Sequence, residues 1–380
     1  MNTKKRIDGD YYIETINAND RVYIDTDTLE VDGNLVVSGN LTYINTEELN
    51  VSDPFIVLNS SNTATYAATQ AATATGSEGT ASGGTEVTSG GYKYHVFTGS
   101  GTLTISDGYK AFEYLVVGGG GRGAIGGGGG GGIATGTAKV VISDITVVVA
   151  GGGTGNGTSV GNPGDSSSIA WDTTTGNTQT ITAIGGGGGM DQKDGYAADS
   201  KNHGGCGGGG ASMYFSGLRT SHASGGFGLK GLNDTYIFNG GRTGSAIVNS
   251  DYGFNGGNAA SNPSGQGTFQ GAGGGGASEA GASSGTTAGF AGTGGNGTSD
   301  FSSWLSAVSG SVTLGEEDSG TYYICGGGAG TGRTNTGAQS HGTAGLGGGG
   351  RAGPGNANSG GGGGSGGDGG SGFVIIRYAV

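Results

Sequence analysis

The sequence predicts an all-β protein in which a β-core is combined with a packed array of polyglycine II helices. Segments such as 112–117 and 373–378 are apolar on both faces, which is typical of strands inside a packed layer. Runs of glycine adjoin these strands directly, whereas flexible linkers do not usually abut buried strands. The 97 glycines among 380 residues therefore predict an ordered body and not a disordered polymer.

The N-terminal region, residues 1–60, is predicted to form short strands. β-Branched and aromatic residues alternate with polar ones, and the pairs Asp32-Gly33 and Ser38-Gly39 indicate turns. Strands this short bury little apolar surface alone. We therefore expect three chains to intertwine here as a homotrimer, with a small monomeric β-domain as the alternative.

Residues 61–91 are rich in Ala, Thr, Ser and Gly and almost lack bulky apolar side chains, a composition that predicts a linker. Residues 92–380 are predicted to form one glycine-rich domain. Its strands at both ends of the range are expected to assemble into a single β-core.

The glycine runs are predicted to form extended helices with three residues per turn. Such helices make no internal hydrogen bonds, so their amides and carbonyls must find partners in neighbouring segments. Without Cβ atoms the segments can approach closely, and the seven-residue run 126–132 would span about 22 Å. Runs of four or more glycines lie at 118–121, 126–132, 185–189, 207–210, 273–276, 347–350 and 360–364.

Isolated aromatic residues interrupt the glycine-rich sequence. We expect Phe227, Phe254 and Phe269 to cover the packed slab of polyglycine II helices or to fill the β-core. Exposed positions at loop tips are the alternative. Residues 300–308 are predicted to form a short helix with Asp300 as its N-cap. Trp304 in this helix is either a core residue or a contact residue.

Composition disfavours several classes of partner. The net charge of −13, without a cationic cluster beyond the first residues, disfavours nucleic acid. No segment approaches the roughly 18 apolar residues of a membrane helix, so membrane insertion is not expected. The N-terminus lacks the apolar region of a secretion signal, which predicts folding in a cytoplasm. In that reducing compartment Cys206 and Cys325 are expected to be free thiols, with a single bridge as the alternative.

Motifs of catalysis and of metal binding are weak. GxGxxG is expected by chance in this composition, and no serine follows a strand-to-helix elbow. His203 and Cys206 have a spacing compatible with one metal ion, but no second pair completes a site. The acidic residues 316–318 are expected to form a solvated turn, with a divalent-cation site as the alternative. The sequence therefore predicts no enzyme, no catalytic residue, no cofactor and no metal.

Three parts of the chain carry a family resemblance. Residues 93–190 and 366–379, most specifically 370–378, resemble the glycine-rich domain of many phage tail and fibre proteins. The glycine slab is similar to the tail-tip adhesins of T-even-like phages. Residues 31–61 resemble structural proteins of large tailed phages, notably cyanophage-like ones. An additional β-rich N-terminal region distinguishes this sequence from the adhesins.

The resemblance implies a virion structural protein, a fibre or spike made in the host cytoplasm. Its N-terminal region would bind other virion proteins, and its loops would bind a bacterial cell-surface protein or glycan. The alternative is an architectural head-decoration or collar protein without receptor binding. Aromatic and arginine side chains are enriched in binding hot spots and mark the candidate contact loops Ala211–Lys230, Thr235–Tyr252 and Ser299–Arg333. The candidate contact residues are Tyr214, Phe215, Arg219, Tyr236, Trp304 and Tyr322.

Overall fold

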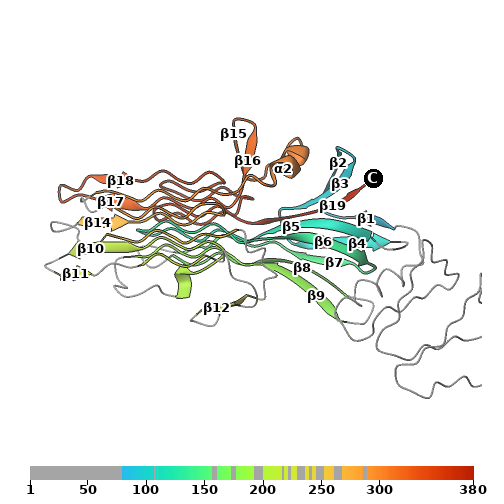
Figure 1. The fold of residues 1–380 in the computed structure, drawn as a ribbon, viewed down its shortest axis with the longest axis horizontal. Helices are drawn as coiled ribbons and strands as arrows, with labels where there is room; N and C mark the ends of the chain where they lie inside the picture. The colour runs from blue at the N-terminus through green and yellow to red at the C-terminus, as the bar shows by residue number, and fades with distance from the viewer. Residues whose placement is uncertain are drawn as a thin grey trace, which may run out of the picture. The chain divides into compact units, whose positions relative to one another are not determined.

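The computed structural model shows a β-sandwich whose strands continue directly into a slab of glycine-rich segments (Figure 1). The predicted N-terminal β region, residues 1–60, lies outside the described residues, as does the predicted linker up to residue 78. The structure describes residues 79–380 except 107, 109, 156–160, 173–176, 192–199, 216–217, 221–223, 229–235, 239–241, 245–251, 261–267 and 286–288.

The sandwich consists of two antiparallel sheets of five strands each. The first sheet has the order β2-β3-β19-β5-β6, and the second has the order β1-β4-β7-β8-β9. The first comprises β2 (Thr85–Ser89), β3 (Tyr92–Phe97), β5 (Lys110–Val117), β6 (Ile133–Val141) and β19 (Phe373–Ala379). The second comprises β1 (Thr80–Ser82), β4 (Gly101–Ser106), β7 (Ile145–Val148), β8 (Ser167–Asp172) and β9 (Thr178–Ala183).

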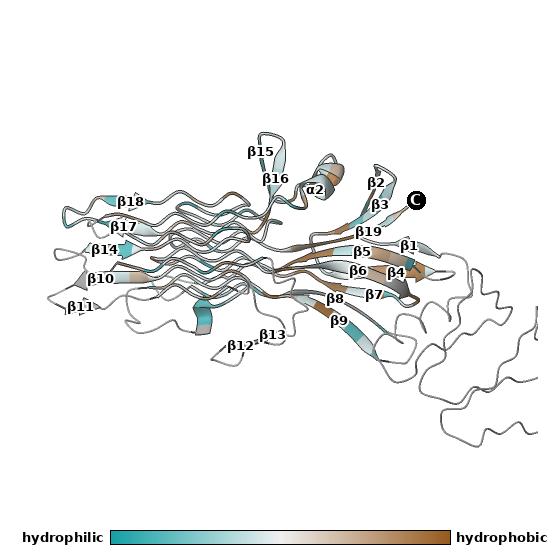
Figure 2. Cartoon of the chain, viewed as in Figure 1, coloured by the Kyte–Doolittle hydropathy of each residue, from teal (hydrophilic) through white to brown (hydrophobic). Residues whose placement is uncertain are grey.

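The first sheet is covered on both faces. Val116 and Val374 belong to a core shared with the second sheet, which contributes Leu103, Ile145 and Ile169. On the opposite face, a second core joins strand residues to the helix α2 (Ser302–Val308) and the segments beside it. Its members include Leu115, Val117, Leu305, Val308, Phe373 and Ile375. Hydrophobic residues accordingly gather on the sandwich strands in Figure 2.

These two cores confirm that the strands at 112–117 and 373–378 are buried on both faces, but they divide the single β-core that was predicted. Strands β5 and β19 are apolar on both faces because each face packs against a different layer. Strand β19 pairs with both β3 and β5, so the end of the chain completes a sheet that begins at the start of the folded domain. The all-β class is confirmed: the described residues form antiparallel sheets with α2 as a short helix.

The slab is held by hydrogen bonds between glycine-rich segments. Along residues 118–123, successive amides donate to three different neighbouring segments, and the same neighbour returns after three residues. The acceptors lie in 129–132 for Gly118 and Gly121, in 162–165 for Gly119 and Arg122, and in 367–370 for Gly120 and Gly123, at 2.8–3.1 Å. Residues 126–132 repeat this pattern with 184–190, 272–275 and 360–363. The hydrogen bonds thus point in three directions, and each direction recurs every third residue. Helices with three residues per turn require this pattern. The polyglycine II conformation itself stays a prediction, because bond partners establish the period but not the hand.

Glycine is required in the slab because the neighbouring backbones leave no room for a side chain. A Cβ on Gly127, Gly128 or Gly131 would overlap the carbonyl oxygen of Gly328, Gly121 or Gly118 respectively. Each obstructing atom belongs to a backbone that is itself hydrogen-bonded on several sides. The segments therefore cannot move apart for one methyl group without breaking bonds elsewhere.

Two boundary predictions were wrong. The predicted linker, 61–91, contains β1 and β2, so the folded domain begins before residue 92. Gly90 and Gly91 both have positive φ, as two-residue hairpin turns of type I′ require, and they join β2 to β3. The helix near 300–308 is confirmed, but Phe301 and not Asp300 occupies its N-cap. Asp300 instead accepts a hydrogen bond from the Tyr252 hydroxyl.

The three phenylalanines have different environments. Phe269 packs against a small core of Ile125, Met190 and Ala211 within the slab, as predicted. Phe254 is half-buried, and Phe227 is 56% exposed. Phe227 therefore follows the alternative, an exposed position. Within the described residues, no helix has the length and apolar character needed to cross a bilayer.

We predict that a methyl group inside the slab destabilises the domain. Gly128→Ala should lower the free energy of unfolding by about 3 kcal/mol or more, because the clash is with backbone that cannot move aside. Gly310→Ala is the matched control, since nothing lies within 4 Å of its Cβ position. Calorimetric unfolding of the two variants measures the difference; equal unfolding temperatures would contradict the packing described.

The cysteines are both free and buried, which confirms the predicted free thiols. Burial raises the pKa of the Cys206 thiol to about 12, and burial together with the nearby Cys206 raises the pKa of Cys325 well above its ordinary value. Both thiols therefore stay protonated at neutral pH.

We accordingly predict that the native protein does not react with Ellman's reagent at about pH 8, because the thiolate is the reactive form. Denaturation in guanidinium chloride should release both thiols for reaction. Rapid reaction of the native protein would show that the slab opens readily around these residues.

Candidate functional site

The end of the slab far from the sandwich carries a sheet of short strands, here called the tip sheet (Figure 1). Its order is β11-β10-β14-β17-β18. Several of its strands continue glycine segments, so the slab determines where they lie. The strands are β10 (Ala211–Phe215), β11 (Leu218–Thr220), β14 (Thr268–Gly271), β17 (Thr331–Arg333) and β18 (Gln339–His341).

Half of the predicted contact residues lie on one hairpin of the tip sheet. Tyr214 and Phe215 are in β10, and Arg219 is in β11, directly opposite Tyr214 in the register. Tyr236 lies elsewhere, in the hairpin of β12 (Tyr236–Phe238) and β13 (Arg242–Gly244). The structure therefore brings Tyr214, Phe215 and Arg219 together and separates Tyr236 from them.

The hairpin of β17 and β18 has an exposed turn in the tip sheet. Residues 335–340 are exposed, and the Thr334 amide donates to the Ala338 carbonyl oxygen at 2.9 Å to close the turn. The predicted contact loop Ser299–Arg333 ends just before this turn. Sequence reasoning missed the turn because its small polar residues carry no aromatic or arginine signal.

Trp304 is a core residue, so its assignment as a contact residue was wrong. Its side chain is 9% exposed and packs edge-on against Phe301 in the core beside the first sheet. The Arg377 guanidinium lies 3.8 Å from the centre of the Trp304 ring and 2.6 Å from a Glu113 carboxylate oxygen. Arg377 thus fastens α2 to strands β5 and β19.

Tyr322 lies in a hairpin next to α2, formed by β15 (Glu316–Asp318) and β16 (Thr321–Tyr323). The ring is half-buried, and the Tyr322 amide donates to the Ser302 hydroxyl at 2.9 Å. The expected acidic turn at 316–318 is a strand of this hairpin. Glu316 accepts hydrogen bonds from the amides of Gly347 and Gly348, each at 2.8 Å, and so ties the hairpin to the slab.

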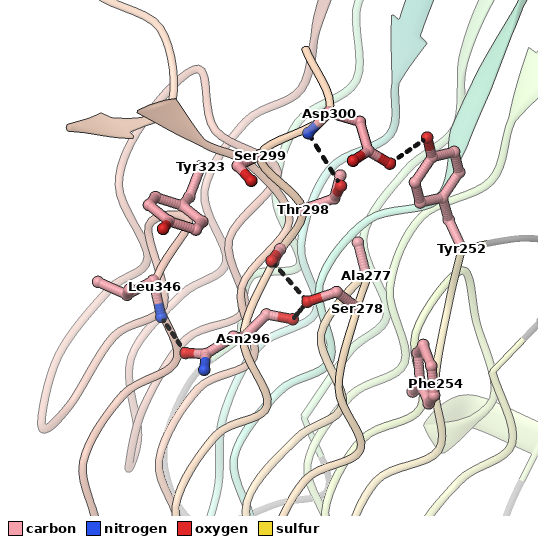
Figure 3. A pocket seen from close by; sticks show the side chains of 11 residues that line it. Tyr252, Phe254, Ala277, Ser278, Asn296, Thr298, Ser299, Asp300, Tyr323 and Leu346 are labelled. Carbon is pink, nitrogen blue, oxygen red and sulfur yellow. Dashed lines mark hydrogen bonds between the residues drawn. The ribbon is translucent and has the colours of Figure 1, made fainter. Parts of the chain in front are cut away.

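A hollow of about 380 Å³ opens beside this hairpin, on the slab (Figure 3). Tyr323 flanks it on one side, and Tyr252 and Phe254 flank it on the other. Asn296, Ser299 and Asp300 contribute polar groups between the aromatic rings. Its volume lies within the range of small-molecule sites, about 300–1,000 Å³.

The walls of the hollow are held in place by hydrogen bonds. The Tyr252 hydroxyl donates to Asp300 Oδ2 at 2.7 Å, and the Leu346 amide donates to Asn296 Oδ1 at 3.0 Å. Ser278 Oγ donates to the Gly297 carbonyl oxygen at 2.8 Å. These bonds join four segments that are distant in sequence, so the hollow is formed before any ligand arrives.

Sequence reasoning identified two loops that contribute residues to the hollow, but it did not predict the hollow itself. Tyr252 ends the predicted contact loop Thr235–Tyr252, and Ser299, Asp300 and Tyr323 lie in the loop Ser299–Arg333. Their contact depends on the order of the glycine segments within the slab. No local pattern in the sequence encodes that order.

The possible metal pair His203 and Cys206 has another role. His203 Nδ1 accepts a hydrogen bond from the Phe227 amide at 2.9 Å, and the two rings stack with centroids 5.1 Å apart. Cys206 is fully buried in the slab. Among the residues that the structure describes, no three His, Cys, Asp or Glu side chains gather as metal ligands.

We predict that Arg377→Lys loosens α2 and lowers the free energy of unfolding by about 1–2 kcal/mol. Lysine cannot reproduce the planar stacking on Trp304 together with the contact to Glu113. Arg351→Lys is the matched control, because Arg351 is exposed. Denaturant titration followed by tryptophan fluorescence measures both variants, and equal losses would contradict the anchoring role.

Comparison with protein families finds a glycine-rich domain in this chain. The family model of the glycine-rich domain matches residues 95–299, more than half of the chain. The match begins in β3 and ends at Ser299, which lines the hollow. The residues after the match supply α2 and β19 to the same fold. No curated protein matches the sequence. The chain therefore belongs to the glycine-rich domain family.

Proposed function

We propose that this protein is a structural component of a bacteriophage particle, a fibre or spike that displays loops to the host cell surface. The supporting observation is the tip sheet, held at the end of the hydrogen-bonded slab opposite the β-sandwich (Figure 1). The resemblance of residues 93–190 and 366–379 to phage tail and fibre domains supports the same assignment.

A slab of bonded glycine segments suits the display of loops for a physical reason. Binding loses free energy when flexible loops must become ordered, so loops on a rigid support lose less. We infer that the segments are polyglycine II helices, whose bonding to neighbours on all sides would give the slab its rigidity. The tip hairpins can then vary in sequence without disturbing the support.

In this proposal the N-terminal region and the tip sheet have different partners. The N-terminal region binds other virion proteins, with a homotrimer as the expected assembly. Tyr214 and Arg219, opposite each other in β10 and β11, are the first candidates for receptor contact. The receptor is a bacterial surface protein or glycan, and catalysis has no part in the function.

The test is host adsorption by phage that carry substitutions in the tip sheet. The double variant Tyr214→Ala, Arg219→Ala should lower the adsorption rate about tenfold or more, because both residue types are typical of hot spots. The control is the double variant Thr102→Ala, Thr146→Ala. These two exposed residues are also opposite each other in the register, but they lie on strands β4 and β7 of the sandwich. Particle yield should be unchanged in both.

The same measurement is made on variants in which the Thr235–Tyr252 loop or the β17–β18 turn is replaced. Normal adsorption by all of these variants and by the tip variants would contradict receptor binding. A defect in particle stability with normal adsorption would instead support the architectural alternative, a head-decoration or collar protein.

A further inference from the structure

We propose that the hollow beside α2 binds a neutral sugar, one hexopyranose unit of a surface polysaccharide. This site is separate from the tip sheet, so the proposal goes beyond display of the tip loops. It depends on the geometry of the hollow and on the chemistry of its walls. Three properties of those walls select this class of ligand.

The first property is charge. Asp300 supplies a carboxylate to the hollow, and no lysine or arginine lines it among the described residues. Glu279, bonded to Asn296 at 2.8 Å, lies just outside and adds negative charge. Phosphorylated, sulfated or carboxylated ligands would therefore be repelled, which leaves neutral and cationic ligands. The hydrogen-bonding groups of the hollow decide between these two classes.

The second property is hydrogen bonding. Among the described residues, the hydroxyls of Ser299 and Tyr323 have no partner, and the Tyr252 hydroxyl occupies Asp300 Oδ2 but not Oδ1. The Asn296 amide uses its oxygen for the Leu346 amide and its nitrogen for Glu279, so it supports the wall. The hollow thus offers a carboxylate acceptor and two hydroxyls that can donate or accept. A ligand with several hydroxyl groups matches this set.

The third property is the pair of aromatic walls. Tyr323 on one side and Tyr252 with Phe254 on the other line the hollow, and each residue is half-buried (Figure 3). A pyranose ring has one face of C–H groups and a rim of hydroxyl groups. Its C–H face can pack on an aromatic ring while its rim bonds to polar groups, as amphipathic aromatic sites require.

The hollow is also preorganised. The bonds between Tyr252 and Asp300 and between Leu346 and Asn296 are present without a ligand. On its far side, β16 is tied to α2 by the Ser302 hydroxyl, and α2 is anchored by Arg377. A ligand therefore gains its contacts without ordering the walls.

The experiment is saturation-transfer NMR with the full-length protein and methyl glycosides of glucose, galactose, mannose, rhamnose and N-acetylglucosamine. We expect transfer to at least one glycoside with an affinity of about millimolar. N-Acetylneuraminic acid and choline serve as anionic and cationic probes, and neither should show transfer.

The variants Asp300→Asn and Tyr323→Phe should each weaken binding about tenfold. Asp300→Asn replaces a carboxylate acceptor of the hollow with an amide donor, and Tyr323→Phe removes a hydroxyl of the hollow. Asp318→Asn is the matched control, because Asp318 is exposed in β15 of the same hairpin and does not line the hollow. Asparagine keeps an oxygen for the Tyr252 hydroxyl, and Tyr323→Phe keeps the ring, so both variants should fold.

Saturation transfer to a neutral glycoside that is lost in Asp300→Asn or Tyr323→Phe and kept in Asp318→Asn would support the proposal. Absence of transfer to every neutral glycoside would overturn it. Binding unchanged in both hollow variants, or preference for choline or the sialic acid, would overturn it as well. Phage adsorption by tip variants is measured separately, so failure here leaves the tip proposal unaffected.

Discussion

The structure depends on hydrogen bonding between backbones that carry no side chains. Glycine segments such as 118–123 and 126–132 direct their amides outward, and neighbours on three sides receive them in turn. Ordering so many glycines costs more backbone entropy than ordering any other residue. The arrangement is stable because nearly every amide along segments such as 126–132 finds a carbonyl, and because close packing excludes water from those bonds.

The β-sandwich determines which glycine segments become neighbours and in which register they pair. Identical glycine segments could pair in any register, since no side chain distinguishes one alignment from another. Strands β5 and β6 pair Val117 with Ile133, and the pairing then continues as Gly118 to Gly132 and Gly121 to Gly129. The ladder period changes from two residues to three where the side chains end, but the alignment set by the strands is retained. The sandwich therefore establishes the register that the slab propagates.

The same division explains how much could be predicted from the sequence. The double-sided strands β5 and β19 could be recognised, because burial on two faces leaves continuous apolar runs. Strand β2 was assigned to a linker, because an edge strand with polar side chains has the composition of a linker. Asp300 was expected as a helix cap because local propensity favours it there, but a tertiary contact with Tyr252 determines its position. The hollow could not be predicted, because glycine segments contain no pattern that encodes their order in the slab.

The side chains that do occur within the slab follow the same constraint. Arg122 occupies a position in the segment 118–123 where a glycine would otherwise stand, and it is 4% exposed. Its guanidinium reaches the Gly366 carbonyl oxygen, in a turn between two segments, at 3.2 Å, and Asp368, in the segment that follows this turn, at 3.4 Å. A long side chain is thus accommodated where the adjacent segments turn, and it bonds to the turn itself. Exposed side chains occur where segments turn, as in residues 335–340 of the β17–β18 hairpin.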